Sequence, residues 1–256
     1  MRFDVITLFP ELFAPFLTSG VTRRAYESGL VEVKLWNARD YAEGNYKRVD
    51  DRPFGGGPGM VMLAEPLALC LAAIRAERAS SNDPVVLFSP VGKVLNHAAV
   101  ESWSASQGAV LICGRYEGID QRFINKHVTH EISLGDFVLS GGEIAAMALL
   151  DAVARLQPGV LNDEGSHQLD SFNPALDGLL DCPHYTRPDA WQDQTVPGAL
   201  MSGNHALIER WRREQRLSLT QRQRPELVQK ARAAEQLSSK DEIFLATLVA
   251  NPGQQP

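Results

Sequence analysis

Cys113-Gly-Arg-Tyr-Glu-Gly-Ile-Asp120 and Leu134-Gly-Asp-Phe-Val-Leu-Ser-Gly-Gly-Glu143 are two glycine-bracketed turns that decide the fold. A short apolar run, Gly108–Cys113, leads into the first turn, and Val128–Leu134 leads into the second. Apolar runs of this length that end at a glycine favour buried parallel strands, although a buried helical segment is an open alternative. The second turn enters Gly141–Leu150, an apolar run of good helix formers. We therefore expect two strands whose polar loops meet at the carboxyl edge of a sheet, where open α/β folds bind ligands.

The rest of the first 160 residues alternates between strand and helix patterns. Strands are expected at Phe3–Phe9, Val31–Trp36 and Val85–Phe88. Apolar residues at helical spacing predict a helix over Glu65–Ala79, and Asn96 is a candidate N-cap for the next one. Shorter helices are expected at Glu11–Leu17, Thr22–Ser28 and Asn96–Ser104. This alternation predicts an α/β domain with a mainly parallel sheet.

The glycines have two interpretations. They can serve tight turns alone, since glycine tolerates backbone conformations that other residues avoid. Two successive loops with charged residues between their glycines favour a binding site instead. Neither loop matches the dinucleotide fingerprint or the phosphate loop, so the sequence argues against a nucleotide-binding oxidoreductase.

The composition is that of an ordinary globular protein, with 44% apolar and 22% charged residues among 256. Its apolar stretches are too short to span a bilayer, and we expect the start of the chain to be a first strand, not a signal peptide. Three widely spaced cysteines, Cys70, Cys113 and Cys182, favour reduced thiols over disulfides or a zinc site. A cytoplasmic protein without a membrane partner is the expectation.

The net charge of −6 argues against a nucleic-acid partner, but the charge is unevenly distributed. Short helices are expected at His205–Gln215, Arg224–Gln236 and Asp241–Ala250. Within His205–Arg232, eight basic residues face three acidic ones. This excess suits a phosphate backbone, and a solvated helical face is the alternative.

Three segments resemble the bacterial tRNA (guanine-N1)-methyltransferases, the TrmD family of the SPOUT class. They are Gly114–Asp120, Gly135–Glu143 and Pro183-His-Tyr-Thr-Arg-Pro188. The glycine-rich segment Asp50-Asp-Arg-Pro-Phe-Gly-Gly-Gly-Pro-Gly-Met60 is similar to a further signature of that family. The similarity runs from Met1 to about Leu248.

The resemblance implies a SPOUT-type α/β fold, whose mainly parallel sheet contains a deep trefoil knot, followed by a small all-helical C-terminal domain. The expected boundaries are 1–160 for the cofactor-binding catalytic domain, 161–177 for a flexible linker and 178–256 for a tRNA-binding domain. It also implies a homodimer with active sites at the subunit interface. The implied activity is methylation of N1 of guanosine 37 in tRNA.

The implied cofactor is S-adenosylmethionine, with Mg²⁺ assisting turnover at a site that no carboxylate cluster identifies. By resemblance, three loops at strand ends hold the cofactor. Their residues are Ser89, Pro90 and Gly92, then Gly114, Arg115, Tyr116, Glu117 and Gly118, then Leu134, Gly135, Asp136, Phe137, Val138, Leu139, Gly141 and Gly142.

Two residues carry the implied chemistry. Asp170, which precedes Ser-Phe, corresponds to the family's general base, and Arg155 corresponds to the residue that stabilises guanine O6. Glu117 is a candidate acceptor for the guanine amino group. From the residues alone, an exposed loop aspartate or a helix N-cap is the favoured interpretation of Asp170. On the same basis Arg155 can be a cation on a helix surface, and Glu117 a carboxylate that stabilises its own loop.

The expected RNA contacts lie mostly in the C-terminal part. They are Arg52, His184, Arg187, His205, Arg212, Arg213 and Arg216, together with Glu117. The chain departs from the family's usual spacing at Asn173–Asp177, a longer segment beside Asp170. The rival functions are a SPOUT enzyme that methylates a ribose 2′-hydroxyl or another base, and an RNA-binding module without turnover.

Overall fold

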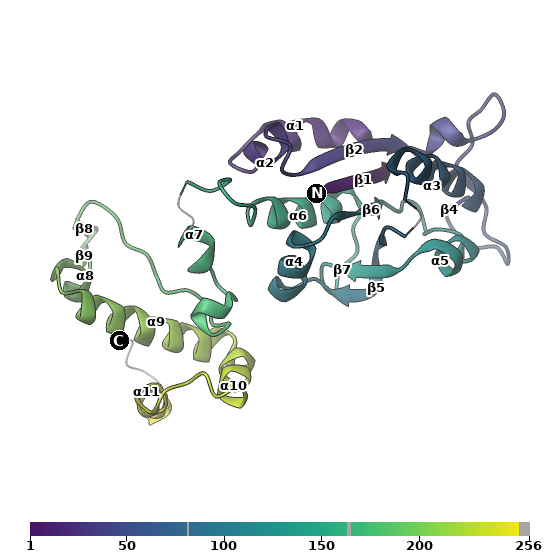
Figure 1. Cartoon of the computed structure of the whole chain (residues 1–256). Helices are drawn as coiled ribbons and strands as arrows, with labels where there is room; N and C mark the ends of the chain where they lie inside the picture. The colour runs from purple at the N-terminus through teal and green to yellow at the C-terminus, as the bar shows by residue number, and fades with distance from the viewer. Residues whose placement is uncertain (81, 163–164, 251–256) are drawn as a thin grey trace. The chain divides into compact units, whose positions relative to one another are not determined.

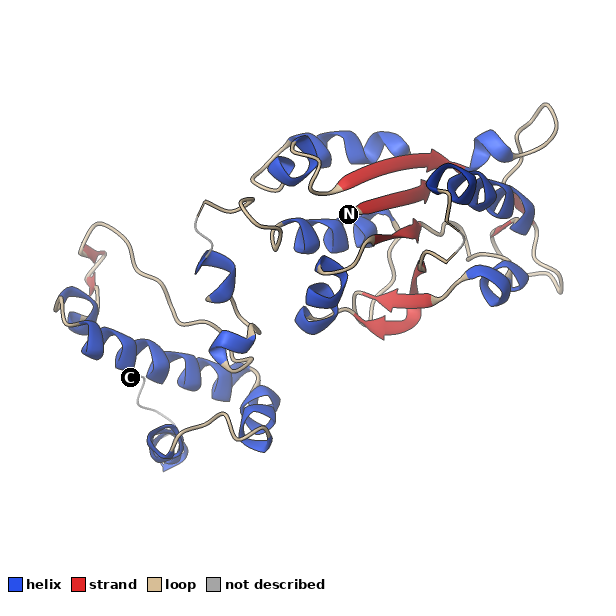
Figure 2. Ribbon diagram, viewed as in Figure 1, coloured by secondary structure: helices blue, strands red, loops and turns tan. Residues whose placement is uncertain are grey.

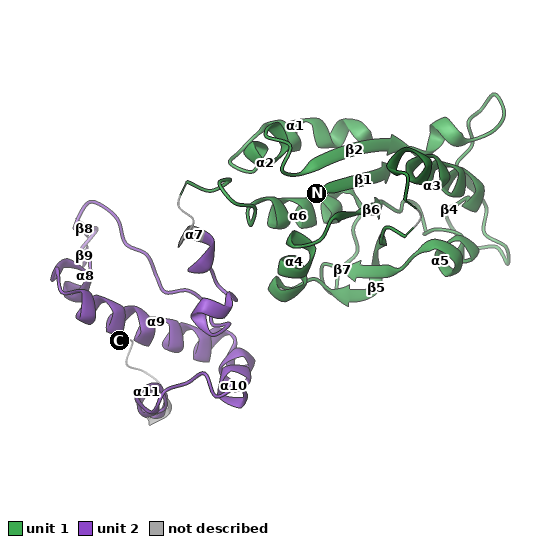
Figure 3. Cartoon of the chain, in the orientation of Figure 1, with its two compact units in different colours: residues 1–162 green, residues 163–256 purple. Residues whose placement is uncertain are grey.

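The computed structural model describes residues 1–80, 82–162 and 165–250. The chain divides into two compact units, Met1–Asn162 and Asp163–Pro256 (Figure 3). Residues 163 and 164 of the expected linker, and residues 251–256 of the expected C-terminal domain, lie outside the described residues. Among the described helices, none combines the length and apolar character needed to span a lipid bilayer.

A five-stranded sheet forms the centre of unit 1 (Figures 1 and 2). Its strands pair in the order β2-β1-β6-β5-β7, and every pairing is parallel. They are β1 (Arg2–Thr7), β2 (Glu32–Asn37), β5 (Val85–Val94), β6 (Gly108–Ile112) and β7 (His130–Ser133). The mainly parallel α/β sheet expected from the sequence is confirmed.

Helices cover both faces of the sheet, and each face has its own apolar core. One core joins Phe3 and Val5 of β1 to residues of α1 (Phe13–Thr18), α2 (Arg23–Glu27), α4 (His97–Ser104) and α6 (Glu143–Ala154). The other joins Ile6 to residues of α3 (Ala64–Arg78), α5 (Gln121–His127) and the 3₁₀ helix η2 (Ala38–Tyr41). Side chains alternate across a strand, so neighbouring residues of β1 serve opposite cores. A 3₁₀ turn, η1 (Pro10–Leu12), follows β1.

Most expected elements occur within a few residues of their predicted limits. The Asn96 side chain accepts a hydrogen bond from the backbone of Ala99, which confirms the predicted N-cap. The strand expected at Val85–Phe88 is longer, because the chain rejoins β7 at Lys93 after a bulge. The sequence analysis did not identify α5, whose N-cap is Asp120.

The glycine-rich segment contains a short hairpin that its composition did not predict. β3 (Asp50–Asp51) pairs antiparallel with β4 (Val61–Met62). The residues between them project outward, and the Phe54 side chain at this tip is fully exposed. The two short strands fix the ends of the glycine-rich loop between them.

A network of charged side chains surrounds Asp4 in the amino-terminal half of β1. Arg2, Arg78 and the Trp36 indole all donate hydrogen bonds to the buried Asp4 carboxylate. Both carboxylate oxygens accept at least two bonds, at 2.6–3.0 Å. Burial raises the pKa of Asp4, but the hydrogen bonds from Arg2, Arg78 and Trp36 outweigh it, so the pKa lies below its ordinary value.

Unit 2 has a small apolar core formed by Leu179, Leu217, Val228, Ala231 and Leu245. Its elements are α7 (Gly165–Gln168), η3 (Pro174–Leu176), α8 (Gly198–Met201), α9 (His205–Gln223), α10 (Pro225–Ala233) and α11 (Ser239–Ala250). It is not entirely helical, because β8 (Ala190–Trp191) and β9 (Gln194–Thr195) pair as a hairpin. Two-residue strands of this kind leave no periodic pattern by which the sequence would reveal them.

Residues 165–177 of the expected linker contain local structure, including α7 and η3. The longer segment Asn173–Asp177 begins with a side-chain cap, in which Asn173 accepts a hydrogen bond from the Ala175 backbone. Leu176 is buried, and the Asp177 carboxylate lies 2.7 Å from the Arg213 guanidinium. These contacts anchor the additional residues within unit 2.

Candidate active site

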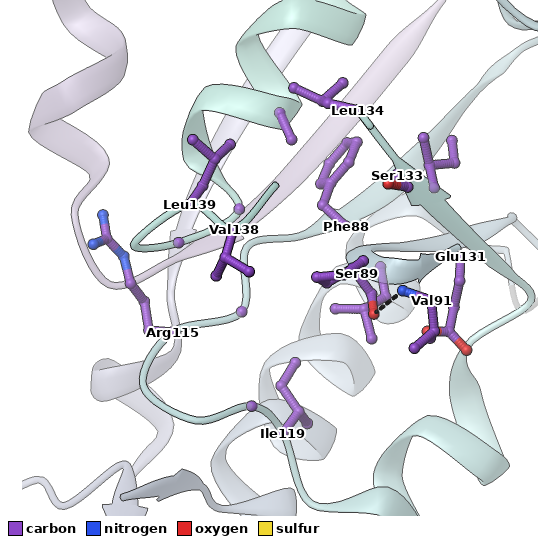
Figure 4. Close-up of a pocket in the computed structure, with 18 of the residues that line it drawn as sticks. Phe88, Ser89, Val91, Arg115, Ile119, Glu131, Ser133, Leu134, Val138 and Leu139 are labelled. Carbon is purple, nitrogen blue, oxygen red and sulfur yellow. Dashed lines mark hydrogen bonds between the residues drawn. The ribbon is translucent and has the colours of Figure 1, made fainter. Parts of the chain in front are cut away.

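Three loops at the carboxyl edge of the sheet enclose a cavity of about 500 Å³. They follow or interrupt β5, β6 and β7, in agreement with the rule that open parallel sheets bind ligands at this edge. Figure 4 shows Phe88, Leu134, Val138 and Leu139 around this space, with the Arg115 side chain at one side. The cavity thus combines an apolar wall with a few polar groups, as is typical of small-molecule sites.

The first loop, residues 89–92, is the bulge within β5. Phe88 and Lys93 both lie opposite Ile132 of β7, so the residues between them leave the ladder. The Val91 backbone donates to the Ser89 hydroxyl across 3.4 Å, as Figure 4 shows. A Cβ atom at Gly92 would lie 2.5 Å from the Glu131 carbonyl carbon, so this return to the sheet requires glycine.

The second loop, residues 114–118, follows β6 and is held against the glycine-rich segment. The Glu117 backbone donates to the Met60 carbonyl, and the Met62 backbone donates to the Gly118 carbonyl, both across 2.9 Å. Tyr116 adopts a φ of +61°, a conformation that costs energy in a residue with a side chain. Strain of this kind clusters at functional sites, so it supports the assignment of this loop to a site.

The Glu117 side chain lies against the glycine-rich segment. A Cβ atom added at Gly59 would approach Glu117 Oε1 to 2.4 Å. Glycine at this position therefore makes room for the Glu117 carboxylate, which lines the cavity. This contact supports a role for Glu117 in stabilising its own loop. Glu117 also lines the cavity.

The third loop, residues 134–142, packs directly on the second. Arg115 and Gly141 form an isolated antiparallel bridge, and the Gly142 backbone donates to the Gly114 carbonyl across 3.0 Å. A Cβ atom at Gly142 would lie 2.8 Å from Cys113 Cα. Such close backbone contact is possible only for glycine.

A buried carboxylate lies beneath these loops. Glu143 begins α6, and its Oε1 accepts hydrogen bonds from the Thr7 hydroxyl and Arg115 Nε, at 2.8 and 3.1 Å. Its Oε2 lies 3.0 Å from Arg115 Nη2 without the alignment of a hydrogen bond. Arg115 Nη1 donates to the Ser140 carbonyl, and its guanidinium stacks on the Phe9 ring. The sequence analysis did not assign Glu143, because its partner Thr7 is distant in the chain.

The cavity brings together most of the residues expected to hold a cofactor. Those that line it are Ser89, Pro90, Gly114, Arg115, Tyr116, Glu117, Gly118, Leu134, Phe137, Val138, Leu139, Gly141 and Gly142. Gly92 instead lines an adjacent cavity of about 530 Å³, and Asp136 is exposed. Gly135 also lies outside the lining, beside the Phe137 ring. Leu87, Phe88, Ile119 and Glu131 line the first cavity but were not predicted; the apolar pattern of Leu87 and Phe88 indicates only a buried strand.

Two titratable groups near the cavity keep their protons at neutral pH. Burial, followed by the nearby Glu143 carboxylate, raises the pKa of Cys113 well above its ordinary value. The Cys113 thiol is therefore a poor nucleophile. Burial, followed by the charge of Asp50, raises the pKa of Tyr116.

The two residues expected to act in catalysis belong to different units. Arg155 is half-buried at the C-terminal end of α6, where its backbone donates to the Asp151 carbonyl. Asp170 is half-buried after α7, and its carbonyl accepts from the Asn173 backbone. Phe172, two residues on, has a φ of +73°, and the Arg224 guanidinium lies 5.8 Å from its ring. Arg155 is not among the residues that line the cavity.

The expected RNA contacts differ in exposure. Arg52, His184, Arg187 and His205 are exposed, and Arg212 is half-buried. His184 Nε2 lies 2.8 Å from the Asp181 carboxylate. These side chains reach solvent, as phosphate contacts require, although most of the basic stretch in α9 also carries acidic partners such as Glu209 and Glu214.

Arg213 and Arg216 instead hold unit 2 together. Arg213 pairs with Asp177 and, through two hydrogen bonds, with Asp241. Arg216 is buried and pairs with Asp181. Burial lowers the pKa of Arg213, but its hydrogen bonds to Asp241 and Asp177 outweigh this and raise it overall. Their position in internal ion pairs gives these two arginines a structural explanation that their sequence pattern did not reveal.

Among the described residues, Asp181, Cys182 and His184 form one group that could hold a metal ion. Mg²⁺ prefers oxygen ligands in octahedral geometry. A buried thiol and an imidazole do not fit this preference, and burial raises the pKa of the Cys182 thiol. The Asp181 carboxylate is already bonded to Arg216 and to the Cys182 backbone. The expected Mg²⁺ therefore receives no site from this group.

Comparison with known proteins identifies the family of the chain. Residues 1–230 match the family model described as tRNA (Guanine-1)-methyltransferase TrmD. A tRNA (guanine-N(1)-)-methyltransferase of Polaromonas sp. (strain JS666) is 79% identical over 257 residues, covering 99% of both chains. Proteins of the same name from Paracidovorax citrulli and Bordetella pertussis are 71% and 56% identical, each covering 97% of this chain and 98% of the relative. The chain therefore belongs to the tRNA (guanine-1)-methyltransferase family TrmD, whose members have the SPOUT fold.

Proposed function

We propose that this chain transfers a methyl group from S-adenosylmethionine to N1 of guanosine 37 in tRNA. The observation that carries the proposal is the convergence of three glycine-rich loops on one cavity in a member of the TrmD family. Transfer to a ring nitrogen needs a site for the methyl donor, a site for an extruded guanine and a group that removes the N1 proton. The proposed residues divide these tasks between the two units.

The cavity has properties that suit S-adenosylmethionine. Phe88, Leu134 and Leu139 offer apolar contacts to an adenine ring, and Gly114, Gly141 and Gly142 allow backbone groups to approach it closely. Glu117 and Glu131 add negative charge, which favours a cationic sulfonium. When bound, this cofactor supplies an electrophilic methyl group.

We assign the proton transfer to Asp170 and the stabilisation of guanine O6 to Arg155. A carboxylate held against the N1 proton acts as a general base as the methyl group is transferred. A guanidinium beside O6 stabilises the negative charge that develops as the N1 proton leaves. Glu117 accepts a hydrogen bond from the guanine amino group, which distinguishes guanine from adenine.

We assign the tRNA contacts to the basic side chains that reach solvent. Arg52, His184, Arg187, His205 and Arg212 meet the phosphate backbone, while Arg213 and Arg216 maintain the surface that carries them. The proposal includes a homodimer with active sites at the subunit interface, as the resemblance to the TrmD family implies. The exposed apolar residues Phe54, Val91 and Val138 support such an interface.

The test is methyl transfer from labelled S-adenosylmethionine to unmodified tRNA transcripts with guanosine or adenosine at position 37. Nuclease digestion and mass spectrometry then locate the product. We expect 1-methylguanosine in the guanosine transcript alone. Transfer to a ribose or to another base would contradict the proposal, as would tRNA binding without any transfer.

A variant separates the proposed base from the binding residues. Asp170→Ala should retain cofactor affinity by calorimetry and lose on the order of 10²-fold or more of the transfer rate. The neighbouring Asp177→Ala change removes a carboxylate of the same unit that pairs with Arg213, and it serves as the matched control. Full activity of Asp170→Ala would remove Asp170 from the mechanism.

A further inference from the structure

Glu143 is a buried, charged residue for which the proposed function provides no role. It does not line the cavity, and its side chain is only 1% exposed. A buried carboxylate is costly unless it is paired and hydrogen-bonded, so its partners are the groups that it must hold in place. Those partners come from two strand ends, β1 and β6.

At β1, the Thr7 hydroxyl connects Glu143 to the backbone. It donates to Glu143 Oε1 and accepts a hydrogen bond from the Phe9 backbone across 3.0 Å. Phe9 in turn presents its ring to the Arg115 guanidinium, 4.4 Å from the ring centroid. The end of β1 therefore supports both members of the Glu143–Arg115 pair.

The Arg115 guanidinium contacts its neighbours through different nitrogen atoms. Nε and Nη2 face the Glu143 carboxylate, and Nη1 donates to the Ser140 carbonyl in the third loop. The Arg115 backbone belongs to the second loop, so this one side chain connects the second loop to the third. A Cβ atom at Gly141 would lie 2.3 Å from Arg115 Nε, which shows how closely the third loop packs on it.

We propose that Glu143 is a positioning residue of the cofactor site. Its carboxylate holds the Arg115 side chain between the end of β1 and the Ser140 carbonyl, and thereby fixes the spacing of the second and third loops. Both loops line the cavity, so their spacing sets its width. The inference rests on the proposed function for the identity of the ligand, S-adenosylmethionine, and not for the coupling of the loops.

Glu143→Gln tests the role, because it keeps the size of the side chain and removes the charge that holds Arg115. We expect the Kd for S-adenosylmethionine, measured by calorimetry without tRNA, to rise about tenfold. In steady-state kinetics the KM for S-adenosylmethionine should rise while the KM for tRNA stays unchanged. A purely structural role would not separate the two KM values.

Asp4→Asn is the matched control. It also removes a buried, arginine-paired carboxylate from the same sheet, but its partners Arg2, Arg78 and Trp36 lie outside the cavity lining. It should lower the unfolding temperature and leave the cofactor Kd unchanged. If Glu143→Gln lowers the unfolding temperature in the same way without changing the cofactor Kd, the positioning role is overturned.

Thr7→Val provides a milder test that does not remove a charge. It should raise the cofactor Kd about threefold in the wild-type background and have no further effect on Glu143→Gln, because the two groups act as one unit. Additive effects of the two changes would contradict the proposal.

Backbone hydrogen exchange without any ligand tests the coupling of the loops independently. Glu143→Gln should accelerate exchange in peptides covering 114–118 and 140–142 together, and Asp4→Asn should not. Unchanged exchange in both peptides would overturn the inference. Failure of the wild-type protein to bind S-adenosylmethionine would instead contradict the proposed function, and the exchange result would still decide whether Glu143 couples the loops.

Discussion

Two buried carboxylates of the same sheet, Asp4 and Glu143, are bonded in different ways. In the amino-terminal half of β1, both oxygens of Asp4 accept hydrogen bonds from two arginines and an indole. At the carboxyl edge, Glu143 has one arginine partner, and one of its oxygens lacks an aligned donor. The partners of Asp4 lie in β1, β2 and α3, whereas those of Glu143 are the last residue of β1 and an arginine of the loop after β6. We infer that the fully hydrogen-bonded carboxylate of Asp4 serves stability, whereas the incompletely hydrogen-bonded carboxylate of Glu143 accompanies a cavity.

The largest expected effect is on cofactor affinity, from a substitution at the carboxyl edge of the sheet. Gly142→Ala should weaken S-adenosylmethionine binding by at least about 100-fold, because the added Cβ would approach Cys113 Cα and force the second and third loops apart. Calorimetry measures the change. Gly198→Ala, where a Cβ atom meets open space, should bind like the wild type. If Gly142→Ala retained full affinity, the two loops would not form the site.

A stability effect without a binding effect is expected at Asp4. Asp4→Asn leaves Arg2 and Arg78 without their carboxylate and should cost about 3 kcal/mol of the free energy of unfolding. Urea denaturation gives this value, and calorimetry should find the same cofactor affinity. A loss of affinity equal to that of Glu143→Gln would remove the distinction between the two carboxylates.

Lowering the pH should reduce the free energy of unfolding through Asp4, as the Asp4→Asn change does. The pKa of Asp4 is lower in the folded than in the unfolded state, so its contribution is complete above the unfolded value near 3.9. That contribution is lost as the pH falls through the lower folded value. We expect the Asp4→Asn protein to lose less of its free energy of unfolding than the wild type between pH 5 and about pH 3. Equal losses would show that Asp4 is not held ionised.

Unit 2 has a small apolar core, and ion pairs join its segments. Arg213→Ala removes the partner of Asp177 and Asp241 and should cost about 2 kcal/mol of the free energy of unfolding. Arg212→Ala should leave that free energy nearly unchanged and weaken tRNA binding, with a shallower salt dependence. If Arg212→Ala lowered the free energy of unfolding and Arg213→Ala weakened tRNA binding, Arg212 would be the structural residue and Arg213 the RNA contact.

The smallest effect is expected at the exposed end of the Asp4 network. Glu77 bonds to Arg2 and Lys34 at the surface, where water screens the pairs. Glu77→Gln should leave the thermal unfolding midpoint unchanged within experimental error. A shift as large as that of Asp4→Asn would mean that the whole network, and not its buried member, carries the stability.

The sequence predicted those parts of the fold that depend on local pattern. Buried strands such as Gly108–Ile112 are short apolar runs that end at a glycine, and the cap at Asn96 follows from its side chain and position. The glycine loops identified the cavity because close backbone approach requires glycine wherever the partner lies. These features are readable because their cause lies within a few residues.

Features that depend on distant contacts were not readable. Thr7 and Glu143 are 136 residues apart, so no local pattern connects the end of β1 to the start of α6. Arg213 and Arg216 have the composition of an RNA-binding helix, and only their contacts with Asp241 and Asp181 explain their burial. The bulge in β5 likewise depends on its pairing with β7. Such features require the three-dimensional arrangement.

The most direct test of the cofactor site at the carboxyl edge of the sheet is hydrogen exchange of the wild-type protein with and without S-adenosylmethionine. We expect slower exchange on binding in peptides that cover 87–92, 114–119 and 134–142. Peptides around Asp4, Trp36 and Arg78 should exchange at the same rate in both states. Protection confined to those peptides, or to unit 2, would contradict the assignment of the cofactor site to the carboxyl edge of the sheet.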